Sequence, residues 1–194
     1  MTFEEIKSEL KNYTVGIAGA GGLGSNCAVA LARTGIGRLI ICDFDIVTET
    51  NLNRQYYFKN QVGIKKVTAL KENIQKINPG TEVIINDIKL NESNLVSIFK
   101  NCDVIVEAFD LAEMKKMLIE TCIEHMPNKP LVIGSGMAGF GNSNSIKTIK
   151  NGNIYICGDE MSEVSEDNPP LAPRVGMVAN MQANTVLEIL LKHE

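Results

Sequence analysis

The sequence lacks the residue patterns of a metal-stapled or disulfide-stapled protein. Its five cysteines are widely spaced without a C-x-x-C pair, and the only histidines are His125 and His193. Structural zinc needs four thiolate or imidazole ligands close together, so we expect none here. An odd number of scattered cysteines, one of which is Cys157, indicates reduced thiols in the cytoplasm rather than a disulfide framework.

Long apolar runs and an excess of positive charge are also missing. No run approaches the length of a membrane span, and residues 1–12 lack the cationic and apolar regions of a signal peptide. The formal net charge is −4, which gives no reason to expect a surface that coats nucleic acid. The 44% hydrophobic content suffices for a core. We expect a soluble, cytoplasmic, single domain over residues 1–194 that binds neither membrane nor nucleic acid.

The most informative segment that is present is a glycine-rich turn, VGIAGAGGLGS at residues 15–25. Gly19, Gly21 and Gly24 have the G-x-G-x-x-G spacing, and Gly22 adds a fourth glycine. The first glycine permits a tight turn, the second lets backbone approach a phosphate, and the third lets a helix pack on a strand. The helix N-terminus then offers N–H groups to an anion. Asp43 lies roughly 20 residues on, at the offset of a ribose-binding acid.

Strand and helix patterns alternate along the chain. Five short runs predict strands at 14–18, 38–43, 82–86, 104–108 and 131–135. Five periodic segments predict helices at 2–12, 22–33, 64–78, 92–100 and 112–125. Polar alternation after residue 136 predicts a hairpin, followed by a loop at 161–173 and a helix at 175–192. The fold class is therefore α/β: a Rossmann-like, doubly wound, mainly parallel sheet with a C-terminal antiparallel hairpin and terminal helix.

Residues 45–62 follow a strand end and have no clean period, which is typical of functional loops in α/β folds. The loop contains NLNRQ, with Asn51, Arg54 and Gln55, and Lys65 and Lys66 follow it. Basic side chains at the carboxyl ends of parallel strands, facing a glycine turn, suit a polyphosphate. Arginine supplies a fork for phosphate oxygens and lysine a point charge. For Lys65 we favour an ordinary solvated charge.

Asp110 is the second informative carboxylate. It closes the strand predicted at 104–108, at the same edge of the sheet as the glycine turn. Oxygen coordination of Mg²⁺ suits such a position. The alternative is an N-cap for the helix that starts at residue 112, and the two roles are compatible.

In their order, GAGGLGS, DFD, NLNRQ, GIKKV and AFD resemble the E1-like adenylyltransferases of the ThiF, MoeB and HesA family. The resemblance extends from about residue 13 through the terminal helix, and NLNRQ with the downstream Lys and Asp is not part of a general dinucleotide-binding pattern. The short length and the closing segment PLAPRVGMVANMQANTVLEILL are similar to short bacterial ThiF proteins. Those proteins adenylylate the sulfur carrier protein ThiS in thiamine (thiazole) biosynthesis.

The resemblance implies ATP and Mg²⁺, and it assigns roles to residues. Arg54 would stabilise charge at the α-phosphorus, Lys66 matches the lysine before Val in G-x-x-K-V, and Asp110 matches the aspartate associated with Mg²⁺ and catalysis. Asp43 would hold the ribose hydroxyls. The nucleotide-binding set implied by the glycine motif and the resemblance together is Gly19, Gly21, Gly22, Gly24, Asp43, Asn51, Arg54, Gln55 and Lys66.

The implied reaction is attack by a carrier's C-terminal glycine carboxylate on the α-phosphate, which gives an acyl-adenylate and pyrophosphate. Positioning and electrostatics suffice for this step without a protein nucleophile. Family members pair, so a homodimer is expected, but residues 1–13 contain no Arg to enter a partner's site. Cys157 is the candidate for the family's reactive loop cysteine, and an inert strand thiol is the favoured interpretation.

Several alternatives stay open. Within the family, the substrate could be the molybdopterin carrier MoaD, or the activity that of a tRNA threonylcarbamoyladenosine dehydratase. An NAD-dependent oxidoreductase would use the glycine turn and Asp43 but leave Asn51, Arg54 and Lys66 unexplained. A non-catalytic carrier-binding subunit is disfavoured by the intact set of acidic and basic residues. Carrier identity cannot be read from the sequence, because carrier recognition spreads over a surface.

Overall fold

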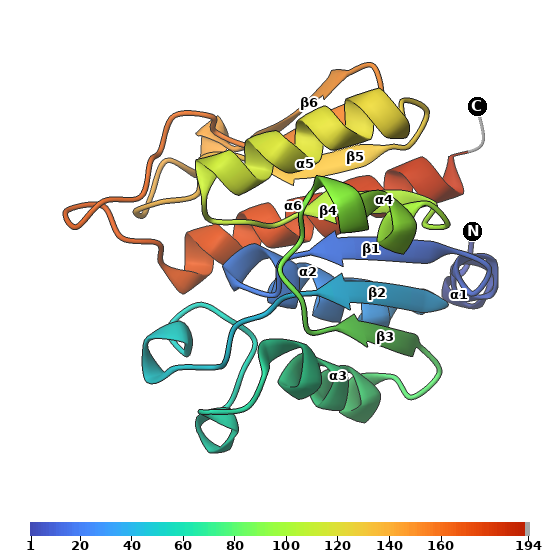
Figure 1. Ribbon diagram of the computed structural model, residues 1–194, viewed down its shortest axis with the longest axis horizontal. Helices are drawn as coiled ribbons and strands as arrows, with labels where there is room; N and C mark the ends of the chain where they lie inside the picture. The colour runs from blue at the N-terminus through green and yellow to red at the C-terminus, as the bar shows by residue number, and fades with distance from the viewer. Residues whose placement is uncertain (193–194) are drawn as a thin grey trace.

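A computed structural model describes residues 1–192 and contains a seven-stranded sheet (Figure 1). The strands are β1 (Thr14–Ala18), β2 (Arg38–Cys42), β3 (Glu82–Asn86), β4 (Val104–Glu107), β5 (Leu131–Gly134), β6 (Lys147–Asn151) and β7 (Ile154–Gly158). Their order is β3-β2-β1-β4-β5-β7-β6, and every neighbouring pair is parallel except β6 with β7. The predicted fold class is confirmed, with the antiparallel hairpin at one edge.

The strand order reverses between β1 and β4, whose registers pair Ala18 with Glu107. In doubly wound sheets, ligands bind outside the carboxyl ends of the strands at such a switch point. Because β1, β2, β4, β5 and β7 run parallel, the loops that follow them leave the sheet at the same edge. The fold thus brings the glycine turn, the residue 45–62 loop and Asp110 to one side of the molecule.

Helices cover both faces of the sheet. They are α1 (Phe3–Leu10), α2 (Gly22–Thr34), α3 (Lys66–Ile77), α4 (Glu92–Phe99), α5 (Ala112–His125) and α6 (Ala172–Leu191). One apolar core joins the sheet to α1, α2, α3 and α6, and a second joins the opposite face to α4 and α5 (Figure 1). All five residues of β1 are buried, which explains its continuous apolar character. Within residues 1–192, no helix is long and apolar enough to cross a membrane.

Local signals in the sequence account for most element boundaries. A capping box between Thr2 and Glu5 starts α1, and Gly35 ends α2 in the left-handed region with φ 95°. The loop at residues 45–62 contains two short 3-10 turns, η1 (Glu49–Asn51) and η2 (Lys59–Gln61). Neither could be predicted, because the loop has no apolar period.

The main boundary error lies at α6. The prediction started this helix at residue 175, whereas it begins at Ala172 and carries Pro173 in its first turn. Proline is tolerated there because the first N–H groups of a helix have no intrahelical partner. The correction places Arg174, which lay between the predicted loop and the predicted helix, on the helix, where its buried side chain is 4% exposed.

Candidate nucleotide-binding site

The glycine turn has the close packing that its spacing predicts. Gly19 adopts φ 100°, and a Cβ atom on Gly24 would lie 1.8 Å from the Gly19 carbonyl oxygen. The start of α2 therefore rests directly on the turn, which only glycine allows. Gly21 is the N-cap of α2, and no side chain among the described residues caps this end. Its first N–H groups are thus available to an anion.

Asp43 joins the glycine turn to the loop that follows β2. Its Oδ2 atom accepts a hydrogen bond from Ala20 N at 2.6 Å, and Oδ1 accepts one from Asp45 N at 2.8 Å. Burial raises the pKa of the Asp43 carboxyl, although these two backbone donors and Lys66 oppose the shift. Each carboxylate oxygen has a second lone pair, so the group can still accept bonds from ribose hydroxyls.

The loop of residues 45–62 folds Arg54 back onto the glycine turn. Asn26 donates through Nδ2 to the carbonyl oxygens of Gly22 (2.7 Å) and Arg54 (2.9 Å), which fastens the loop to α2. A Cβ atom on Gly22 would lie 3.7 Å from Cγ and 3.8 Å from Cδ of Arg54. Among the described residues, the guanidinium bonds Asn53 Oδ1 and the Thr50 carbonyl oxygen, at 2.9 and 3.3 Å, and these are exposed contacts that a phosphate could replace.

Asn51 and Gln55, two further polar residues of NLNRQ, make different contacts. Asn51 Oδ1 accepts a bond from Thr48 N at 3.0 Å, so this side chain shapes the loop. Gln55 is 9% exposed, and its buried Oε1 atom has no hydrogen-bond partner within residues 1–192. Its Nε2 atom would be 3.8 Å from a Cβ atom on Gly21. An unpartnered amide oxygen beside the glycine turn is costly unless something else binds there.

Lys66 is buried at the start of α3. Its Nζ atom bonds Asp45 Oδ2 at 2.7 Å, and its side chain is 8% exposed. Because Asp45 N bonds Asp43, Lys66 is linked to the Asp43 carboxylate through one residue. Lys65 instead pairs with Asp87 at 3.0 Å and has a side chain 43% exposed, in keeping with the favoured interpretation of it as a solvated charge.

Asp110 lies in the turn between β4 and α5 and is exposed. The N-cap of α5 is Leu111, without a side-chain capping bond, so the expectation that Asp110 caps this helix is wrong. The turn that carries it is anchored by Phe109 N, which donates to Glu107 Oε1 at 2.7 Å. Phe109 also lies against the turn glycine, since a Cβ on Gly19 would be 3.4 Å from its ring. Asp110 therefore faces solvent close to the glycine turn.

Two buried ion pairs at this edge were missed by the sequence reasoning. Glu107 is fully buried and pairs with Lys115, which also donates to the Gly134 carbonyl at 2.8 Å. Burial raises the pKa of Glu107 against the opposing effect of Lys115. The second pair joins Arg174 to Asp159. A lone glutamate inside the apolar run at 104–108 was the only available signal for the first pair.

All five cysteines are free and buried. Cys157 is 0% exposed on β7, where its Sγ atom lies 3.6 Å from Thr185 Oγ1, and burial raises the pKa of its thiol. A buried neutral thiol is a poor nucleophile. Within residues 1–192, no three His, Cys, Asp or Glu side chains are grouped to hold a metal ion. His193 lies outside the described residues, and the absence of zinc stays a prediction.

Comparison with known proteins agrees with this geometry. The profile of the ThiF family matches residues 2–194. The adenylyltransferase and sulfurtransferase MOCS3 of Caenorhabditis briggsae is 33% identical over 193 residues, which cover 96% of this chain and 48% of that protein. The chain therefore belongs to the ThiF family. It spans about half the length of the curated relatives it matches.

Solved structures show the same fold. The Escherichia coli tRNA N6-threonylcarbamoyladenosine dehydratase TcdA in complex with ATP superposes with a TM-score of 0.86 at 23% identity, covering 97% of this chain and 89% of that one. E. coli MccB with MccA has a TM-score of 0.74 at 25% identity, covering 95% and 58%. The relatives carry several different names, so they do not single out the ThiS-specific branch.

Proposed function

We propose that this chain catalyses the ATP-dependent adenylylation of the C-terminal glycine of a ubiquitin-like sulfur carrier protein, with ThiS as the first candidate. The single observation that carries the proposal is the position of Arg54. Its aliphatic stem lies against Gly22 at the start of α2, and its guanidinium makes exposed bonds to Asn53 and Thr50 that a phosphate could replace. An NAD-dependent oxidoreductase would use the glycine turn and Asp43 but would leave the set of Asn51, Arg54 and Lys66 unexplained.

The proposed chemistry uses no protein nucleophile. A carboxylate oxygen of the carrier's terminal glycine attacks the α-phosphorus of ATP, and the bond to the bridging oxygen of pyrophosphate breaks. The glycine turn holds the phosphates and Asp43 holds the ribose. Arg54 and Lys66 neutralise charge that develops on the α-phosphate, where prearranged charges contribute most. The buried setting of Lys66 limits its motion to the neighbourhood of Asp45.

The residues also fit a magnesium ion. Mg²⁺ usually binds through one or two carboxylates together with substrate phosphates, and Asp110 is an exposed carboxylate at the carboxyl end of β4. When bound, the ion would neutralise charge on the phosphates. We propose that Asp110 holds it and that Gln55, whose Oε1 atom lacks a partner, completes the lining of the site.

Carrier-dependent ATP–pyrophosphate exchange tests the proposal directly. Purified chain is mixed with ATP, Mg²⁺, labelled pyrophosphate and one carrier at a time: ThiS, a MoaD-type carrier, or each without its last glycine. Exchange with an intact carrier and none with its truncated form supports the function, and the better carrier identifies the substrate. Exchange with neither carrier would sink the proposal. Tighter calorimetric binding of NAD(H) than of ATP would favour the oxidoreductase instead.

We also propose that residues 1–194 form one domain that assembles as a homodimer. The last helix carries Met177, which is 41% exposed and offers apolar surface for pairing. Light scattering at micromolar protein should give twice the mass of 21.2 kDa. A monomeric mass that is unchanged by carrier would contradict the assembly.

A further inference from the structure

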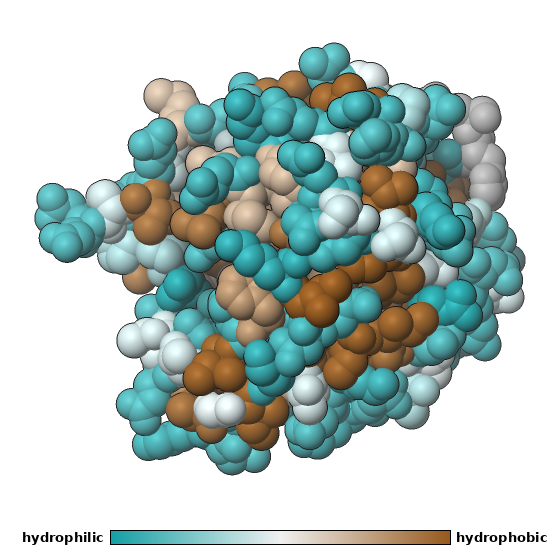
Figure 2. Space-filling model, in the orientation of Figure 1, coloured by the Kyte–Doolittle hydropathy of each residue, from teal (hydrophilic) through white to brown (hydrophobic). Residues whose placement is uncertain are grey.

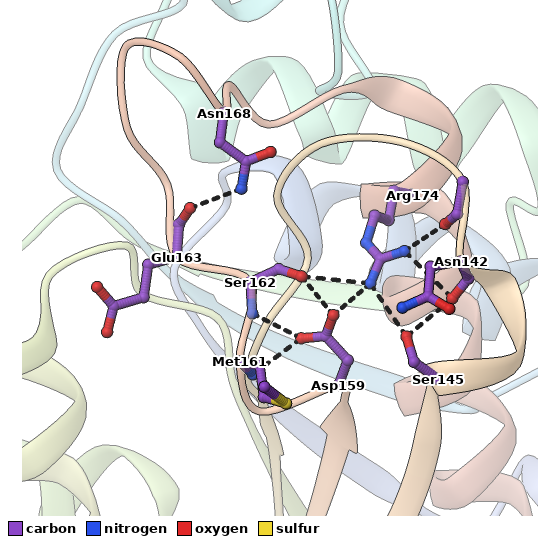
Figure 3. Close-up of polar contacts among 9 residues, drawn as sticks. Asn142, Ser145, Asp159, Met161, Ser162, Glu163, Asn168 and Arg174 are labelled. Atoms are coloured by element: carbon purple, nitrogen blue, oxygen red, sulfur yellow. Dashed lines mark hydrogen bonds and ion pairs between the residues drawn. The ribbon is translucent and has the colours of Figure 1, made fainter.

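Arg174 is the most extensively bonded side chain outside the nucleotide-binding elements (Figure 3). Its guanidinium pairs with Asp159, and it donates to the Gly141 carbonyl oxygen at 2.5 Å and to Ser162 Oγ at 3.4 Å. Asp159 in turn accepts bonds from the backbone N–H groups of Met161 (2.9 Å) and Ser162 (2.8 Å). One buried ion pair therefore joins three segments: the first turn of α6, the loop at residues 135–146, and the segment at residues 159–171, which we call the strap.

The strap is also fastened at its far end. Gly139 N donates to the Pro169 carbonyl oxygen at 2.9 Å, and Asn168 donates to the Glu163 carbonyl oxygen at 2.9 Å. Gly136 and Gly139 both have positive φ angles, and a Cβ on Gly136 would lie 2.0 Å from Asp159 Oδ1. The two loops thus fit together only because glycine lies at these positions, where any side chain would collide with the strap.

Three large apolar side chains of this assembly are exposed. Phe140, Met161 and Val164 are 88%, 85% and 57% exposed, and Figure 2 shows apolar groups on the protruding loops at the left of the molecule. A well-anchored loop pair that presents large apolar side chains to solvent is a feature of binding surfaces. The pair leaves from the carboxyl ends of β5 and β7, on the edge that also carries the glycine turn.

The same turn of α6 reaches the nucleotide-binding elements. Val175 follows Arg174, and its Cγ1 atom would be 2.9 Å from a Cβ on Gly22. The glycine turn and the loop after β2 border the candidate nucleotide site on one side. The strap and the loop at residues 135–146 leave the same edge of the sheet, from the carboxyl ends of β7 and β5.

The charge of the strap favours a protein over a nucleic acid. Glu160, Glu163, Glu166 and Asp167 are exposed, and no Lys or Arg occurs between residues 151 and 173. A surface of this kind repels a phosphate backbone, which binds through Lys and Arg. A flexible protein tail with apolar or basic side chains meets no such penalty.

Resting on the function proposed above, we propose that Arg174 is a positioning residue that holds the strap in place for the C-terminal tail of the carrier. The tail passes along the strap to reach the α-phosphate beside Gly22 and Arg54. A surface that is already ordered lowers the entropy lost when the tail binds. Arg174 acts through the strap, because Asp159 and the Gly141 carbonyl oxygen accept bonds from its two terminal nitrogens, while its buried Nε atom has no partner among the described residues.

The test separates carrier binding from nucleotide binding. Arg174→Met, Arg174→Lys and Asp159→Asn are compared with Arg38→Met, which removes an exposed ion pair to Glu82 at the opposite edge of the sheet. In the exchange assay, Arg174→Met should raise KM for the carrier about tenfold while KM for ATP and kcat at saturating carrier change little. Arg174→Lys should restore part of the loss, and Arg38→Met should behave as wild type. A Glu-specific protease should cut the strap of Arg174→Met faster than that of wild type.

Two results would overturn the proposal. One is a loosened strap, seen by proteolysis, with an unchanged KM for the carrier; the other is an equal rise in both KM values. If Arg174→Met does not fold, the exposed pair Phe140→Ser and Met161→Ser serves instead, since it leaves the core intact and should raise only the carrier KM. Wild-type protein that exchanges with no carrier disproves the function itself. Binding of tRNA that these variants weaken would assign the surface to nucleic acid.

Discussion

The candidate nucleotide-binding region, residues 14–66, and the C-terminal region, residues 131–191, are built by different means at the same edge of the sheet. The first relies on backbone geometry. A Cβ atom on Gly24 would lie 1.8 Å from the Gly19 carbonyl oxygen, so the turn needs glycine there. The Asp43 carboxylate accepts hydrogen bonds from two backbone N–H groups. The second relies on Arg174 and Asp159, two buried charges. A position that only glycine can fill can be recognised in a sequence. Which two charged residues form a buried pair cannot, because it depends on how distant elements pack.

The two means also differ in how they fail. A Gly→Ala substitution in the turn adds a methyl group that pushes two backbone segments apart at one point. A buried ion pair that loses one partner leaves the other charge desolvated and uncompensated, which is far costlier than never having buried the pair. Variants in the first region should therefore change the exchange rate or the local packing. Variants in the second region should change the KM for the carrier and the stability at acid pH.

The largest expected effect is on catalysis in the nucleotide-binding region. Arg54→Ala and Lys66→Ala should each lower carrier-dependent exchange by about 10²–10³, because each removes a preorganised charge at the α-phosphate. ATP affinity should fall much less, since the interaction strengthens in the transition state. Calorimetry and exchange rates measure the two effects, with Arg38→Ala as the control. Full exchange activity in both variants would refute the mechanism.

Substitutions of Asp43 and Asp110 test two further roles in the same region. Asp43→Ala should chiefly weaken ATP binding, because a ribose contact is equal in the ground and transition states. Asp110→Ala should make activity respond to raised Mg²⁺, since the site then holds the ion less tightly. Titrations of ATP and of Mg²⁺ in the exchange assay separate the two. Identical behaviour of the two variants would contradict their separate roles.

Backbone packing comes next in size. Gly24→Ala should destabilise the fold by about 2–3 kcal/mol, because the new methyl group collides with the Gly19 carbonyl oxygen. Gly176→Ala is the matched control, as it lies on helix α6 with nothing within 4 Å of the added Cβ. It should be neutral or stabilising by up to about 1 kcal/mol. Urea unfolding measures both, and equal effects would mean that the turn relaxes.

Acid stability tests the C-terminal region. Burial acts to raise the pKa of Asp159, but bonds from the Ser162 hydroxyl and from two backbone N–H groups, with the Arg174 charge, outweigh it and lower the pKa to about 2. The unfolded value is about 3.9, so this group stabilises the fold above pH 4 and the contribution disappears as pH falls from about 4 to 2. Its size is about 2 kcal/mol. The difference in unfolding free energy between wild type and Asp159→Asn should shrink over that range, and a constant difference would contradict the pairing.

The smallest effect is expected at Cys157. Cys157→Ala should leave exchange unchanged, because the thiol is fully buried and burial raises its pKa. Native protein should also resist alkylation by iodoacetamide at all five cysteines. A loss of carrier activation in Cys157→Ala without a loss of stability would show that the C-terminal region contributes chemistry as well as position.

Most of the fold could be predicted from local sequence, and the reasons are specific. The bounds of β1, β3 and α5 match the predicted runs, because buried strands are continuously apolar and helices have a 3.6-residue period. The start of α6 was missed because Pro173 normally marks a loop, yet fits the first turn of a helix. The N-cap of α5 was missed because Asp110 has a common capping side chain but lies one residue too early.

The candidate nucleotide site was determined by the sequence itself, since its glycines, Asp43, Arg54 and Lys66 lie within about two strand–helix units whose geometry is local. Which charges are buried together was decided only by the tertiary structure. Glu107 meets Lys115 and Arg174 meets Asp159 because parallel strands end at one edge and α6 packs beside α2. A charged residue carries no period of its own, so its partner becomes visible only when distant elements are packed around it.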